Sequence, residues 1–191
     1  MKRDVWKRKL GLIVAVGLLA VSVDPPQGAR AMTLPEMLKA SEIFTQVAQA
    51  ALLFAANAKK QTDQANAEMD LQSQGRQGAR PSPAEIQRAF GRIAGHLQAA
   101  RAHLRQAKGQ MSTLAAAYQG QLAKTRPGRA EPPKTESEEE KRILARYNEA
   151  YREGATRSER GYEQALHVLT QAEERFEALK KAQGAGNAPG N

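Results

Sequence analysis

The sequence predicts an all-α protein, an elongated antiparallel three-helix bundle or coiled coil with helices of about 40 residues each. Three observations lead to this fold class. Apolar side chains recur at steps of three and four residues, helix-start motifs occur three times, and alanine is common while β-branched residues are few. The 160 residues that remain of the 191 after the predicted signal over 1–31 suffice for one domain with a substantial core.

The clearest apolar repeat lies in the middle of the chain. Its spacing alternates between four and three residues without a break, which is typical of a helix packed lengthwise on other helices. Its members are Ile86, Phe90, Ile93, Leu97, Ala100, Leu104, Ala107, Met111, Leu114 and Tyr118. Such a seam does not specify whose helix it packs against, so an oligomeric coiled coil is the alternative.

Two further seams flank the middle one. The first consists largely of small side chains, which permit close helix approach but bury little area each. Its members are Met37, Ser41, Phe44, Ala48, Ala51, Ala55, Ala58, Thr62, Ala65 and Met69. The last seam is close to a heptad repeat, with two successive four-residue steps between Gly154 and Tyr162. Its members are Leu144, Tyr147, Tyr151, Gly154, Ser158, Tyr162, Ala165, Leu169, Ala172, Phe176 and Leu179.

Each seam follows a helix-start motif. In the S/T-x-x-E capping box, the first side chain and the glutamate satisfy free amides of the first helical turn. The motif occurs at 33–36, 82–85 and 137–140. We therefore expect helices over 34–74, 83–125 and 138–183. The glutamates around position 138 are explained by this location, because carboxylates are favoured at the positive end of a helix dipole.

The N-terminal residues 1–31 are predicted to be a cleaved secretory signal. A basic start precedes an uncharged, mostly apolar run over 10–23, and Ala29-Arg30-Ala31 supplies the small-x-small cleavage pattern. A retained anchor is the alternative, but this run spans only about 21 Å as helix, against a hydrocarbon core of about 30 Å. We expect a mature chain that begins at Met32 and is periplasmic or secreted from a bacterium.

The rest of the chain is expected to be one helical domain over 32–183. Prolines and glycines at 126–136 predict a stiff linker between the second and third helices. The Gly/Asn/Pro-rich segment 184–191 has little to bury and is predicted to be a disordered tail.

The sequence contains no motif typical of catalysis or of a bound cofactor. It has neither a nucleophile elbow nor a glycine-rich phosphate loop. The absence of cysteine excludes disulfides, thiolate metal sites and a lipidated cysteine. His96 and His103 are separated by about 10 Å of helical rise and would need ligands from another helix to hold a metal. We therefore predict a non-enzymatic protein without cofactor or metal.

Charge is concentrated in the middle of the chain. The net charge of the chain is +9, and ten basic residues but only one acidic residue lie between positions 76 and 129. The basic set that we single out is Arg88, Arg92, Arg101, Arg105 and Lys108. These side chains either pair with the acidic neighbouring helices or bind an anionic partner. Nucleic acid fits less well, because the protein is expected to be exported.

One part of the first predicted helix is apolar around nearly its whole circumference. Leu52, Leu53 and Phe54 cover about 200° of arc, so they cannot all face one seam. We predict that they form a partner-binding or self-association patch. The alternative is that a bent or four-helix arrangement covers them internally.

At the level of architecture alone, such an exported, cysteine-free, Ala/Gln-rich bundle resembles two groups of envelope proteins. They are the minor pilus-tip components of conjugative type IV secretion systems and the helical-hairpin periplasmic chaperones and stress sensors. The first resemblance implies an accessory component of an envelope apparatus with protein partners. The second implies a chaperone or an envelope stress or metal sensor, which we keep as the alternative function.

Overall fold

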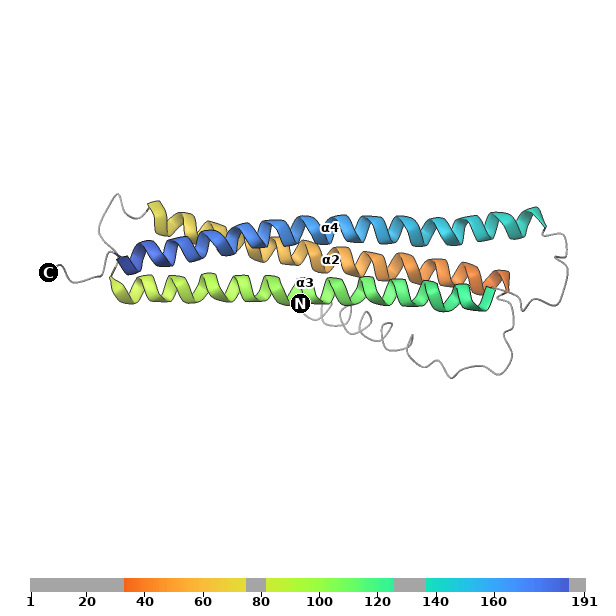
Figure 1. The fold of residues 1–191 in the computed structure, drawn as a ribbon, viewed down its shortest axis with the longest axis horizontal. Coiled ribbons are helices and arrows are strands. Elements are labelled where there is room, and N and C mark those ends of the chain that lie inside the picture. Colours follow the sequence, from red (N-terminus) through yellow and green to blue (C-terminus); the bar gives the residue numbers. More distant parts are fainter. Residues whose placement is uncertain (1–32, 75–81, 126–136, 186–191) are drawn as a thin grey trace, which may run out of the picture. The chain divides into compact units, whose positions relative to one another are not determined.

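The computed structural model describes residues 33–74, 82–125 and 137–185, which form three α-helices and no strand. Helix α2 (Leu34–Gln74), helix α3 (Pro83–Thr125) and helix α4 (Glu138–Ala185) pack against each other (Figure 1). The predicted all-α architecture of three long helices is thereby confirmed. The expected signal peptide and the linker lie outside the described residues.

The bounds of α2 and α3 coincide with the expected ranges, whereas α4 continues beyond its expected end. Gly184 and Ala185, predicted to lie in the tail, belong to α4. Glycine adopts helical backbone angles at a modest entropic cost, so a helix can run through it when no proline follows directly. The remaining tail residues lie outside the described part of the chain.

The capping boxes explain where α2 and α3 begin. The amide of Thr33 donates to Oε2 of Glu36 at 2.7 Å, and the amide of Ser82 donates to Oε2 of Glu85 at 2.7 Å. The amide of Glu85 donates in return to Oγ of Ser82 at 3.3 Å. Donation by Ser82 lowers the pKa of Glu85 below its ordinary value. Helix α4 likewise begins directly after Ser137.

The three helices contribute to two compact units, each with its own core. Unit 1 comprises the described residues of 33–52, 108–125 and 137–159, and unit 2 comprises those of 53–74, 82–107 and 160–185. Within unit 2, residues later in α2 contact residues earlier in α3, so these two helices are antiparallel. The pairs are Phe54 with His103, Gln61 with His96 and Glu68 with Arg92.

The core of unit 1 is aromatic at the N-terminal end of α2. The ring of Phe44 lies 5.1 Å from Tyr147 and 5.9 Å from Tyr151, measured between centroids. The rings of Tyr118 and Tyr151 stack at 3.7 Å. Because Phe44 and Ala48 contact successive turns of α4 in the same order, α2 and α4 run parallel here. Within unit 1, Tyr118 bonds to Asn148 and Leu114 lies beside Gly154, so α3 runs antiparallel to α4.

Helices α2 and α4 approach closely at Gly154 in unit 1. A Cβ atom at this glycine would lie 2.9 Å from Cβ of Ala48, closer than side-chain carbons normally come. One turn further on, the buried Ser158 hydroxyl lies 2.7 Å from the Gly154 carbonyl and 3.3 Å from the Ala48 carbonyl. The predicted pair of four-residue steps therefore coincides with a close helix contact whose buried polar group is satisfied.

The core of unit 2 is built mainly from alanine and leucine. Its buried residues are Ala55, Ala58, Ala65, Met69, Ile93, Leu97, Ala100, Leu104, Ala165, Leu169, Ala172 and Phe176. Buried Thr62 fits among them because its hydroxyl donates to the Ala58 carbonyl at 3.0 Å. All of these residues occupy positions in the predicted seams. The seams therefore identify most buried positions, whereas Ala40, Val47, Ala50 and Ala89 are buried outside them.

Candidate functional site

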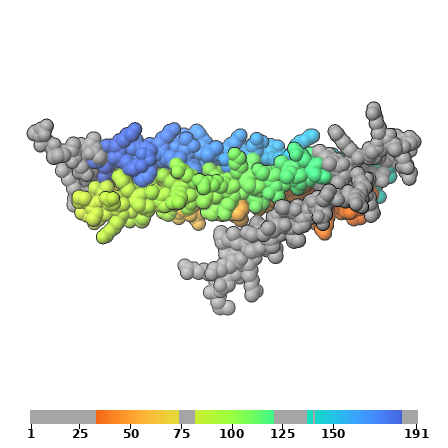
Figure 2. All heavy atoms as spheres, turned by 60° about the horizontal axis from the view of Figure 1, so that its bottom comes forward, coloured from red at the N-terminus to blue at the C-terminus, as the bar shows by residue number. Residues whose placement is uncertain are grey.

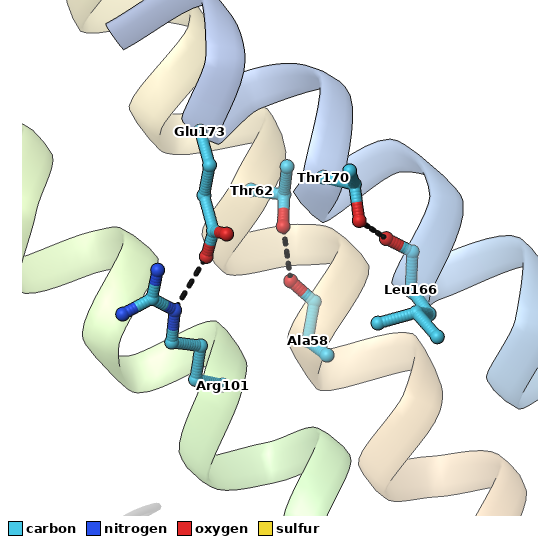
Figure 3. A network of polar contacts seen from close by, with 6 residues as sticks. All are labelled: Ala58, Thr62, Arg101, Leu166, Thr170 and Glu173. Carbon is cyan, nitrogen blue, oxygen red and sulfur yellow. Dashed lines mark hydrogen bonds and ion pairs between the residues drawn. The ribbon is translucent and has the colours of Figure 1, made fainter. Parts of the chain in front are cut away.

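The predicted basic set divides into paired and unpaired side chains. On one side of α3, Arg92 donates from Nε and Nη2 to the two carboxylate oxygens of Glu68 on α2, at 3.1 and 3.0 Å. On the other side, Arg101 donates from Nε to Glu173 on α4 at 2.5 Å (Figure 3). The hydrogen bond from Arg92 lowers the pKa of Glu68, and both arginine pKa values are raised by their carboxylate partners.

The other three members of the basic set are exposed. Arg88 stands near Glu85 and favours the charged form of that carboxylate. Arg105 and Lys108 form no ion pair with any residue in the described part of the chain. Intramolecular pairing thus accounts for Arg92 and Arg101, whereas Arg105 and Lys108 keep a charge that a partner could use.

Unit 2 contains a groove between α3 and α4, with a volume of about 430 Å³. Figure 2 shows the face along which α3 and α4 lie beside each other. The lining residues are Ala94, Leu97, Gln98, Arg101, Ala102, Arg105, Glu173, Phe176 and Glu177. Leu97 and Phe176 are buried core residues, whereas the other lining residues are polar or carry short side chains. The groove therefore has an apolar floor and a charged rim.

Most charges along this rim are already compensated. Arg101 bonds to Glu173, and Lys180 forms an ion pair with Glu177 at 2.5 Å. The ammonium group of Lys180 also lies 4.8 Å from the centroid of the Phe176 ring. Among the described residues that line the groove, Arg105 is the cation without an ion pair. The groove consequently carries a local excess of positive charge at Arg105.

The structure places the three residues of the predicted apolar patch in different environments. Leu53 is 43% exposed, whereas Leu52 and Phe54 are half-buried. The Phe54 ring stacks on His103 of α3, with centroids 6.3 Å apart and planes inclined by 25°. Of the three, Leu53 therefore has the largest surface left for a partner.

The histidines of α3 face α2 and contact neutral groups. Nδ1 of His96 lies 2.9 Å from Oε1 of Gln61, and Nδ1 of His103 lies 3.2 Å from Oε1 of Gln106. Within 33–74, 82–125 and 137–185, no three His, Cys, Asp or Glu side chains come together in a way that could hold a metal ion. In the same residues, no helix is long and apolar enough to cross a membrane.

Sequence reasoning missed the α4 side of the groove and three exposed leucines, Leu38, Leu71 and Leu166. Glu173 directly follows the seam residue Ala172, as Arg101 follows Ala100, and such positions meet across antiparallel helices. This register could have predicted the pair. Leu71, which is 62% exposed on α2, gave no signal because polar residues flank it.

Comparison of this chain with protein-family models, curated proteins and solved structures finds no match. The described residues thus define an all-α protein of three long helices with a groove between α3 and α4.

Proposed function

We propose that this chain is an exported, non-enzymatic helical protein that binds protein partners in the bacterial cell envelope. Its favoured role is an accessory component of an envelope apparatus such as a type IV secretion or conjugation system. The N-terminal order of basic, apolar and Ala-x-Ala segments supports export. Long helices with accessible outer faces support a role in binding, because such faces can contact partners over several turns.

The observation that carries this proposal is the exposure of leucine on a helix whose seam is already filled. The α2 seam on either side of Leu53 is occupied by Ala51, Ala55 and Ala58, all of them buried. Leu53 therefore has no place in the core of this chain and remains 43% exposed. Transfer of such a side chain from water into an interface is favourable by about 1 kcal/mol, given its partial exposure.

Leu166 provides a matched control for Leu53, since it is 41% exposed and lies on α4 of the same unit. We expect Leu53→Glu to weaken binding to envelope partners while helicity by circular dichroism stays unchanged. Leu166→Glu should leave the same binding intact. Photo-crosslinking from position 53 in the native host, followed by fractionation, measures the contact. The proposal would be contradicted if the chain stays in the cytoplasm with residues 1–31 still attached, or if it forms no crosslink to an envelope protein.

The apolar floor of the groove favours a second candidate, a periplasmic chaperone that holds unfolded clients. Leu97 and Phe176 beneath a rim on which Arg105 is unpaired would suit segments that combine apolar and acidic residues. A chaperone should suppress aggregation of a thermally unfolded client protein, as measured by light scattering. A dedicated apparatus component should have no such effect.

A further inference from the structure

We propose that the α3–α4 groove of unit 2 binds one amphipathic helix of a protein partner, with a partner carboxylate paired to Arg105. This inference rests on the proposed function and specifies the partner's chemistry. The partner helix would place apolar side chains over Leu97 and Phe176 and an acidic side chain at the Arg105 end.

The dimensions and lining of the groove suit a helix. On α3 the lining residues extend from Ala94 to Arg105, which corresponds to about 17 Å or three helical turns. The short side chains of Ala94 and Ala102 leave room for another helix to approach at the normal interaxial distance of about 8–10 Å. A fourth helix seated between α3 and α4 would complete a local four-helix arrangement.

Charge complementarity selects an acidic partner over a basic one. The two carboxylates of the rim, Glu173 and Glu177, already pair with Arg101 and Lys180. Arg105 has no ion pair among the described residues, so its guanidinium group is available to bind a carboxylate through two parallel hydrogen bonds. Because Arg105 stands at one end of the groove, this pair would also fix the direction of the partner helix.

The test uses two separate peptides of three to four helical turns as probes, each held helical by a cross-link between its own side chains. Both carry leucines at positions i, i+3 and i+7, and they differ only in one flanking residue near the end, glutamate or glutamine. We expect the wild-type chain to bind the glutamate peptide about threefold more tightly, equivalent to about 0.7 kcal/mol, by fluorescence anisotropy. Arg105→Gln should abolish this preference. Arg88→Gln, an exposed arginine of α3 outside the groove lining, should retain it.

A second pair of variants tests the groove itself. Ala102→Leu fills the groove and should weaken both peptides about tenfold, whereas Ala116→Leu, an exposed alanine of α3 that does not line the groove, should leave binding unchanged. Circular dichroism confirms that each variant is folded. Absence of saturable binding, equal effects of the two leucine variants, or a glutamate preference that survives Arg105→Gln would overturn the inference. If crosslinks from position 53 persist in that case, the groove inference fails while the proposed function stands.

Discussion

Substitution of Gly154 by alanine tests the close approach of α2 and α4 in unit 1. Alanine is intrinsically better in a helix than glycine by about 1 kcal/mol. The new methyl group, however, would lie 2.9 Å from Cβ of Ala48 and 3.8 Å from the Phe44 carbonyl oxygen. Ala48 has no flexible side chain that could move away, so the two helices must shift.

The magnitude follows from these two opposing effects. Overpacking a well-packed core costs about 1–3 kcal/mol, which exceeds the helix-propensity gain. We therefore expect Gly154→Ala to lower the free energy of unfolding by about 1 kcal/mol, equivalent to about 2–4 °C in Tm. Urea unfolding followed by circular dichroism measures this change.

Gly109 provides the matched control, because nothing lies within 4 Å of a Cβ atom placed there. Gly109→Ala should raise the free energy of unfolding by about 1 kcal/mol, since only the propensity effect operates. Adding Ala48→Gly to the Gly154→Ala variant should recover part of its loss by removing the clashing methyl group. If the two alanine variants change stability in the same direction by the same amount, the close contact at Gly154 does not constrain the fold.

Three further predictions concern ionisable or buried polar groups. The hydroxyl of Tyr147 is buried and has no hydrogen-bond partner among the described residues, so Tyr147→Phe should stabilise the chain by about 1 kcal/mol in urea unfolding. Burial raises the pKa of Tyr147 to about 12, so the unfolded chain releases this proton first, near pH 10. The wild type should therefore lose stability between pH 10 and 12, and the Phe variant should lack this loss. The pKa of Glu85 is lowered in the folded chain, so the stabilisation from its capping contact is present above the ordinary pKa of glutamate and is lost as pH falls. Protection of the amides in the first turn of α3 should therefore decrease at low pH in the wild type. Glu85→Gln lacks the carboxylate at every pH and should show no such additional decrease in hydrogen-exchange measurements.

The features that could be predicted from sequence are those that depend on neighbours along the chain. The capping boxes at Thr33 and Ser82 act within one helical turn, so they identify where α2 and α3 begin. The seams identify most buried positions because they depend only on helical periodicity. The predicted end of α4 lies two residues before the observed end at Ala185, because glycine does not stop a helix as strictly as proline does.

The site was less predictable because it depends on which helices become neighbours. Arg92 and Arg101 looked equivalent in the sequence, yet one pairs with α2 and the other with α4. Similarly, the apolar run at 52–54 did not reveal that His103 would cover the Phe54 ring. These contacts require the chain path and the relative register of the helices, which the apolar repeat alone leaves open.

The alanine-rich seam of α2 has a consequence for how the helices find their alignment. A displacement of α2 by one heptad would place Ala55 at the position of Ala48 and Ala58 at the position of Ala51, so these two positions would still be filled by alanine. Phe44 breaks this degeneracy, because the displaced helix would place Ala51 among the tyrosines. The vacated space would cost about 3–5 kcal/mol, the usual penalty for replacing a buried phenylalanine by alanine. Thr62 and Met69 act in the same way further along α2, because the displaced helix would place them at the buried positions of Ala55 and Thr62. The larger side chains of the seam thus distinguish the correct alignment where the alanines do not.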